Sequence, residues 1–122
     1  MELSVYERLM LLQMIPAAHQ QGNFLTQRTL KELMDDIGFS EEELTEWEME
    51  QQENGRITWN DEKADVKMVE LGVIKRGLIM DALVHLDEQN AVSPSLLPIF
   101  ERFNYAEYLA EKAESEVGDA VA

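Results

Sequence analysis

Cysteine is absent from this 122-residue chain and basic residues are scarce: ten Lys and Arg stand against 25 Asp and Glu, a formal net charge of -15. Without cysteine there is no disulfide, no thiol nucleophile and no cysteine-ligated metal. The charge argues against two common partners, because duplex nucleic acid and anionic membranes are bound mainly through Lys and Arg. We therefore expect no direct contact with nucleic acid and none with a membrane.

Long apolar runs are also missing. The longest, Leu9-Met10-Leu11-Leu12, is far shorter than the roughly 18 residues of a membrane helix. The first residues, Met1-Glu2-Leu3-Ser4, are acidic rather than basic, so we expect no secretory signal. These features predict a soluble protein of the cytoplasm, and a protein packaged in a virus particle would share them.

Enough apolar residues are present for one folded domain. Hydrophobic residues make up 45% of the chain, which lies within the globular range. The length suits a single domain, which we expect over residues 1–113. The small, acidic residues 114–122 are predicted to form a frayed tail.

Helix-end signals punctuate the first third of the chain. Ser4 and Glu7 form a capping box for a helix that we expect Pro16 to end near residue 15. Thr26 is predicted to cap a second helix, and Gly38 to end it in a left-handed conformation. The second helix has a core-facing stripe at helical spacing: Leu30, Leu33, Met34 and Ile37.

The pattern then changes from helix to strand. A second capping box, Ser40 to Glu43, predicts a short helix from Glu41. Residues 46–50 alternate between Glu and apolar side chains, which is typical of a half-buried strand. Asn54-Gly55 favours a type I′ hairpin turn, and residues 56–59 and 66–71 are strand-like. We expect a three-stranded antiparallel β-meander.

Helical spacing resumes after Gly72. Residues 79–86 carry the stripe of a core-facing helix. Ser95 is the expected cap of a last helix, because Pro98 is tolerated only in the first turn. Leu97, Phe100 and Phe103 are expected to face inward. The predicted fold class is α+β: N-terminal helices, the meander and C-terminal helices, with a winged-helix-like order in the first half.

The negative charge is concentrated in one segment. Residues 1–34 are neutral, residues 35–55 carry nine acids and no base, and residues 56–122 have a net charge of -6. On the predicted strand, alternate residues would point the same way, about 7 Å apart. This pattern fits either a solvated face or an acidic surface for a basic partner. The candidate partner-binding residues are Glu41, Glu42, Glu43, Glu46, Glu48, Glu50 and Glu53.

Other chemistry finds little support in the sequence. The third helix of a winged-helix DNA reader would here begin with three glutamates and carry no base, so a phosphate backbone would repel it. Carboxylates are abundant, but no pair has an apolar setting that would raise a pKa. His19 and His85 lack a second histidine at metal-ligand spacing, and the HExxH pattern is absent. We expect no cofactor, no metal and no enzymatic activity.

Several segments resemble small proteins of bacteriophages and prophages whose role is generally unassigned. The resemblance covers about residues 4–103 and implies only a context, that of a phage-encoded accessory protein. The segments are Tyr6-Glu7-Arg8-Leu9, Leu11-Leu12, Ile15-Pro16, Gly22-Asn23-Phe24, Phe39-Ser40-Glu41-Glu42-Glu43, Ile57-Thr58-Trp59-Asn60 and Phe100-Glu101-Arg102-Phe103.

Three hypotheses follow for function. In the first, the protein binds a basic host or phage protein through its acidic surface, and in a special case inhibits a DNA-binding protein. In the second, it is a virion or assembly component that forms an oligomer. In the third, the weakest, it is a carboxylate-based enzyme.

Overall fold

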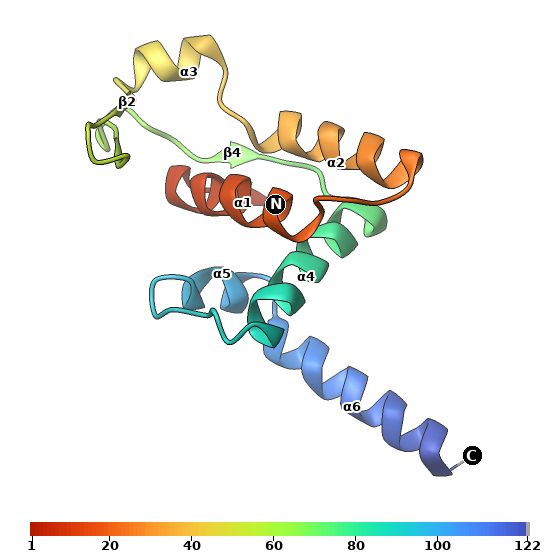
Figure 1. The fold of residues 1–122 in the computed structure, drawn as a ribbon. Coiled ribbons are helices and arrows are strands. Elements are labelled where there is room, and N and C mark those ends of the chain that lie inside the picture. The colour runs from red at the N-terminus through yellow and green to blue at the C-terminus, as the bar shows by residue number, and fades with distance from the viewer. Residues whose placement is uncertain (122) are drawn as a thin grey trace.

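The computed structural model describes the backbone of residues 1–121 and the side chains of residues 1–114 (Figure 1). The elements follow in the order β1 (Glu2–Leu3), α1 (Val5–Ala18), α2 (Phe24–Ile37), α3 (Glu41–Glu46), β2 (Glu50–Gln51), β3 (Ile57–Thr58), β4 (Lys67–Met68), α4 (Val73–Glu88), α5 (Leu97–Arg102) and α6 (Tyr105–Val121). The predicted α+β class is confirmed, with helices dominant. The predicted frayed tail falls almost wholly outside the described side chains and stays a prediction.

The predicted three-stranded meander is wrong. The strands form two separate antiparallel pairs, β2 with β3 and β4 with β1 at the N-terminus. Leu3 faces Lys67 in the second pair, and Leu3 is fully buried. A strand of two residues carries too little pattern to reveal its partner, and β1 precedes the predicted Ser4 cap, where no element was expected.

The strand predicted over residues 46–50 is also wrong. The helix begun at the Ser40 cap runs through Glu46, and Trp47 follows as its C-cap. Glu48 then takes a left-handed conformation, φ 53°, which turns the chain toward β2. Trp47 is buried, as expected for an apolar residue of the alternating segment, but it faces inward because it ends a helix and not because it lies on a strand. The glutamates therefore do not form a row along one strand.

The hairpin lies where Asn54-Gly55 predicted it, with a different turn. Only Gly55 has positive φ, 85°, so the turn is not type I′. The amide of Gly55 donates to the carbonyl of Gln52, and the amide of Gln52 donates to that of Arg56. This is a three-residue loop with a left-handed glycine at its end, the next most common way to close a hairpin.

Both predicted capping boxes are confirmed, two helix ends differ by a few residues, and a third differs in conformation. Pro16 lies inside the last turn of α1 rather than ending it. Asn23, not Thr26, caps α2: its side chain accepts the Thr26 amide at 2.8 Å, and Asn serves as well in this role. Gly38 is extended, not left-handed; a Cβ there would lie 3.0 Å from the Met34 carbonyl oxygen, which explains the glycine.

The C-terminal helices differ in detail from the prediction. Pro98 lies in the first turn of α5 as expected, but Leu96 rather than Ser95 is the N-cap. Phe100 and Phe103 are buried, whereas Leu97 is half-exposed. Asn104, at φ 54°, separates α5 from α6. α6 extends from the body at the end opposite to α3 (Figure 1).

Two apolar clusters meet along α1. The larger joins α1, α2, α4, α5 and the start of α6, and contains Leu11, Ile15, Leu33, Ile79 and Leu83 among its buried side chains. The smaller consists of Val5, Leu9 and Trp47, with Phe39, Met49, Ile57, Trp59 and Ala64 packed around them. Among the described residues, no helix is long and apolar enough to cross a membrane.

Candidate functional site

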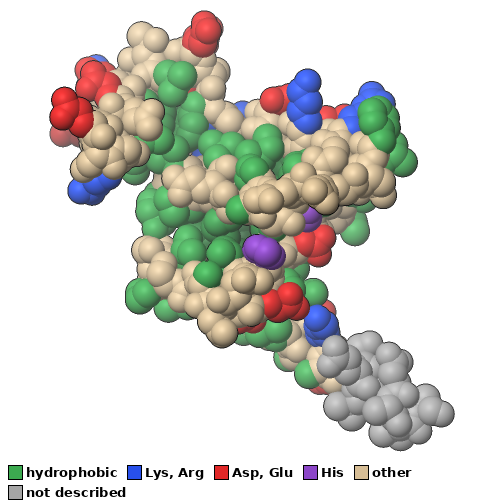
Figure 2. Space-filling model, in the orientation of Figure 1, with side chains coloured by type: hydrophobic (Ala, Val, Ile, Leu, Met, Phe, Trp, Pro, Cys, Tyr) green, Lys and Arg blue, Asp and Glu red, His purple; other side chains and the backbone are tan. Residues whose placement is uncertain are grey.

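α3, the β2–β3 hairpin and the loop that follows form a lobe at one end of the molecule, which we call the acidic lobe (residues 40–65). Figure 2 shows acidic side chains distributed over this lobe. The lobe packs on α1 through the smaller cluster, in which Trp47 is 8% exposed. Phe39 and Trp47 meet edge to face, with ring centroids 6.5 Å apart. The position of the acidic lobe on the rest of the molecule is therefore fixed by side-chain packing as well as by the chain connections.

Arg8 joins α1, α2 and the acidic lobe at one point. Its side chain is fully buried, at 0% exposure. Its two terminal nitrogens donate to the two carboxylate oxygens of Glu43, at 2.8 and 3.0 Å. Nε donates to the Ile37 carbonyl at 2.9 Å, and one terminal nitrogen also donates to the Gly38 carbonyl at 2.6 Å. Arg8 thus satisfies carbonyls at the end of α2 and holds the start of α3.

Aromatic rings shield this ion pair. The guanidinium carbon of Arg8 lies 3.9 Å from the centroid of the Phe39 ring and 5.9 Å from that of Trp47. The Ser40 amide donates to Glu43 at 2.9 Å, completing the capping box. The hydrogen bonds from Arg8 above all, opposed by burial and aided by the Ser40 amide, lower the pKa of Glu43 to about 2. Glu43 therefore faces inward and is engaged within the chain.

Glu48 is also engaged, but at the surface. Its carboxylate accepts from the Asn60 side chain at 3.0 Å and lies 3.3 Å from Lys63 Nζ. The hydrogen bond from Asn60, and next that from Lys63, lower the pKa of Glu48. These contacts tie the left-handed residue after α3 to the turn that follows β3.

The five other candidate glutamates remain exposed. Glu41, Glu42 and Glu46 lie on α3, where with Thr45 they line a shallow hollow. Glu50 lies on β2 and Glu53 in the hairpin loop. Within residues 1–114, none of these five has a salt-bridge partner. Of the seven candidate residues, five are therefore exposed without a salt bridge in this part of the chain, Glu48 is paired at the surface, and Glu43 is drawn into the fold.

Sequence reasoning missed Arg8, although a signal for it was present. Arg8 follows Val5 by three residues and precedes Leu12 by four, so it lies on the apolar side of α1. A lone base on such a face needs a buried acceptor. Glu43 has the carboxylate that Arg8 needs, but it lies 35 residues further along the chain, so no sequence pattern links the two.

The histidines do not form a metal site. His19 Nε2 lies 2.9 Å from the Leu78 carbonyl oxygen, linking the end of α1 to α4. His85 is exposed in the last turn of α4. In the described part of the chain, no three His, Asp or Glu side chains are grouped to hold a metal ion.

The shifted carboxyl groups do not have the pKa of a general acid. Such a group needs a pKa raised toward the working pH. Glu43 and Glu48 have their pKa lowered instead, because each accepts hydrogen bonds in its charged form.

Comparisons with protein-family models, with curated proteins and with solved structures find no match to this chain.

Proposed function

We propose that the chain is a non-enzymatic, phage-type accessory protein whose acidic lobe binds the basic surface of a host or phage protein. The observation that carries the proposal is the exposure of five glutamates without salt-bridge partners in residues 1–114, on a lobe held to the body by the buried Arg8–Glu43 pair. A fixed lobe keeps the charges in one arrangement, so little order must be gained when a partner binds.

The ion pairs within residues 1–114 do not neutralise the exposed glutamates of α3. Arg8 and Lys63 are directed to Glu43 and Glu48, so they leave the charge of Glu41, Glu42 and Glu46 uncompensated. Uncompensated charge of one sign speeds association with a partner of opposite charge, and salt weakens the effect. Inhibition of a DNA-binding protein is the special case in which the partner's phosphate-binding surface is covered. The regular spacing expected from a strand over residues 46–50 no longer supports that case, because Glu46 lies on α3, Glu48 in the turn after it and Glu50 on β2.

The experiment removes charge without removing volume. A triple variant, Glu41→Gln, Glu42→Gln and Glu46→Gln, is compared with a control that loses three exposed charges elsewhere: Glu70→Gln, Asp81→Asn and Glu111→Gln. Both are used for affinity capture from infected or lysogenic cells at low and high salt. We expect wild type and the control to capture the same basic protein at low salt, and the α3 variant to lose it. Equal capture by both variants, or capture insensitive to salt, would contradict the proposal.

A second candidate function, an assembly component that forms an oligomer, is favoured by exposed apolar side chains away from the lobe. Phe24 and Leu25 in the first turn of α2 are 77% and 70% exposed, and Val73 and Ile74 in the first turn of α4 are 90% and 72% exposed. Large exposed apolar groups mark contact sites when they gather in a patch. Light scattering across a concentration series tests this candidate, and a strict monomer that is absent from particles would exclude it.

A further inference from the structure

The tip of the β2–β3 hairpin is formed by an asparagine followed by a glycine, Asn54 and Gly55, and both are exposed. Gly55 has φ 85°, and no atom beyond its chain neighbours lies within 4 Å of the place where a Cβ would stand. β2 and β3 contribute two residues each, and a two-stranded hairpin is only marginally stable by itself. Water and hydroxide can therefore reach the backbone between Asn54 and Gly55.

The side chain of Asn54 is held over this part of the backbone. Its Oδ1 accepts a hydrogen bond from the Arg56 amide at 3.0 Å, which closes a ring that includes the nitrogen of Gly55. The side-chain carbonyl carbon, Cγ, is therefore turned toward the backbone that follows. The same hydrogen bond polarises the carbonyl group, and it would stabilise negative charge formed on Oδ1. Three consecutive residues thus supply an electrophilic carbon, a nitrogen nucleophile and a donor to the developing oxyanion.

We propose that Asn54 is a site of spontaneous deamidation, which adds a carboxylate to the acidic lobe as the molecule ages. Hydroxide removes the amide proton of Gly55, and the Gly55 nitrogen attacks Cγ of Asn54. The N–Cγ bond forms, the Cγ–Nδ2 bond breaks, and Nδ2 takes up a proton from water and leaves as ammonia. Water then opens the five-membered imide at either carbonyl, giving aspartate or isoaspartate. No atom is oxidised or reduced in these steps.

Either product changes the acidic lobe. The net charge becomes one unit more negative than -15, and the new carboxylate lies next to Glu53. Isoaspartate also adds one carbon atom to the backbone before Gly55. The Gln52 amide donates to the Arg56 carbonyl at 2.7 Å, and this bond closes a loop of fixed length, so the longer backbone disrupts it. The proposal concerns the chemistry of one peptide unit and does not depend on whether the lobe binds a partner.

One contact opposes the reaction. The Gly55 amide donates to the Gln52 carbonyl at 2.9 Å, and this hydrogen bond must open before the nitrogen can attack. Opening an exposed loop costs little free energy, because few buried contacts are broken. We therefore expect the folded chain to react no more than about tenfold more slowly at Asn54 than the unfolded chain does.

Asn60 is the matched internal control. Its Oδ1 accepts from the Glu62 amide at 3.0 Å, two residues further along, as Oδ1 of Asn54 does from Arg56. The residue that follows Asn60 is aspartate, and its side chain obstructs the approach of the backbone nitrogen, as the side chain of any residue but glycine does. Nδ2 of Asn60 also donates to Glu48 at 3.0 Å, which holds the leaving group.

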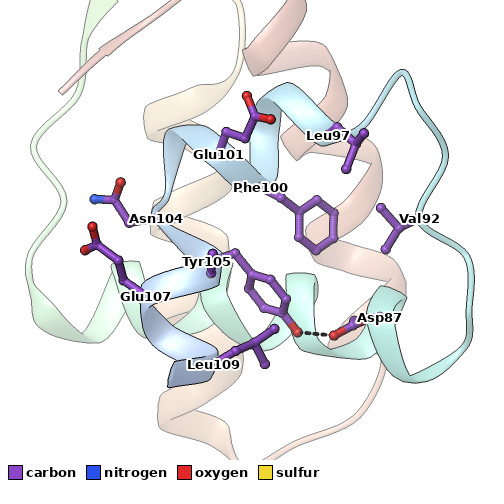
Figure 3. Close-up of a pocket in the computed structure, with 10 residues that line it drawn as sticks. Asp87, Val92, Leu97, Phe100, Glu101, Asn104, Tyr105, Glu107 and Leu109 are labelled. Carbon is purple, nitrogen blue, oxygen red and sulfur yellow. Dashed lines mark hydrogen bonds between the residues drawn. The ribbon is translucent and has the colours of Figure 1, made fainter. Parts of the chain in front are cut away.

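Asn104 is a second control, in a rigid backbone. It lies at a hollow between the end of α4, α5 and the start of α6 (Figure 3). The ring of Tyr105, the next residue, meets that of Phe100 edge to face at 4.9 Å between centroids, and its hydroxyl donates to Asp87 at 2.8 Å. These contacts hold the peptide unit after Asn104 in place, so we expect Asn104 to stay intact.

The full chain is incubated at about pH 8, folded and in guanidinium chloride, and sampled over several weeks. Peptide mapping by mass spectrometry measures the replacement of the amide by a carboxyl group at each asparagine. In the folded chain, Asn54 should convert about tenfold faster than Asn60 and Asn104, or faster still. Asn54→Gln keeps the amide on a longer side chain and should release no ammonia from the hairpin. A protein isoaspartate methyltransferase should label aged wild type and not aged Asn54→Gln.

Three results would overturn the proposal. The first is an intact Asn54 in the folded chain after the same residue has converted in guanidinium chloride, which would show that the hairpin protects it. The second is equal conversion of Asn54 and Asn60 in the folded chain. The third is equal ammonia release from wild type and Asn54→Gln, which would place the reaction at another residue.

Discussion

The Arg8–Glu43 pair makes the strongest quantitative prediction for stability. Arg8→Met keeps most of the side-chain volume and removes the charge. It leaves the largely buried Glu43 carboxylate without its cation and removes the donors to the Ile37 and Gly38 carbonyls. Breaking a buried ion pair from one side costs about 3–5 kcal/mol, a large share of the stability of a domain this size. We therefore expect the free energy of unfolding at pH 7 to fall by about that amount and Tm by roughly 10–20 °C.

The acid limb of the stability curve gives an independent measure. The pKa of Glu43 is about 2 in the folded chain and 4.5 as the ordinary value. Because the folded pKa is the lower one, the unfolded chain binds more protons between these values. The stabilisation is therefore complete above about pH 5 and is lost as the pH falls toward 2. With Glu43 only 19% exposed, it amounts to about 2–3 kcal/mol after allowance for solvent screening.

Urea unfolding of wild type, Arg8→Met, Glu43→Gln and the double variant measures both quantities. Glu43→Gln should lose about 2–3 kcal/mol at pH 6, and more than half of its difference from wild type should be gone by about pH 3. The double variant should lose less than the sum of the single losses, because the two side chains act as one unit. Arg28→Met and Glu42→Gln, at exposed residues, are the matched controls and should change stability little.

A loss of less than about 1 kcal/mol in Arg8→Met would refute this reasoning, because such a value is typical of an exposed ion pair. A difference between wild type and Glu43→Gln that stays constant from pH 6 to pH 3 would refute the assigned pKa. Comparing differences at each pH removes the effect of the other acids, which lose their mutual repulsion as they are protonated.

Three further predictions concern single side chains. Gly38→Ala should lower the free energy of unfolding, measured in urea, by about 1–3 kcal/mol, because the added Cβ would lie 3.0 Å from the Met34 carbonyl oxygen. An unchanged urea midpoint would contradict this close contact between residue 38 and the end of α2. Burial above all, and then the hydrogen bond to Asp87, raises the pKa of the Tyr105 hydroxyl well above its usual value. Tyr105 should therefore stay protonated in the folded chain at about pH 11, so Tyr105→Phe should leave the tyrosinate absorbance unchanged there and lower it only in urea, where the chain is unfolded. A loss of absorbance in the folded chain would show that Tyr105 ionises normally. Lys63→Met should cost less than about 1 kcal/mol in urea unfolding, because its ion pair is exposed, and a loss like that of Arg8→Met would contradict this.

Part of the candidate site could be predicted from the sequence. The excess of acids in residues 35–55 predicted an acidic surface, and six of the seven glutamates in that segment are exposed. Their arrangement was predicted wrongly, because alternation of Glu with Trp47 and Met49 fits a strand as well as a helix end followed by a turn. The hollow at α5 and α6 was not predicted, since it forms only where three helices separated by irregular segments come together.

The sequence by itself determined the features that depend on neighbours a few residues apart. The Ser4–Glu7 and Ser40–Glu43 capping boxes, the stripe of α2 and the position of the hairpin are of this kind, because a side chain needs to reach only three or four residues along the chain. Only the tertiary structure decided the pairing of β1 with β4 and the partners of Arg8, which lie 29 to 35 residues away. Such long-range contacts depend on how the apolar faces of α1, α2 and α4 pack together. That packing sets which glutamate is drawn into the fold and which ones remain on the surface.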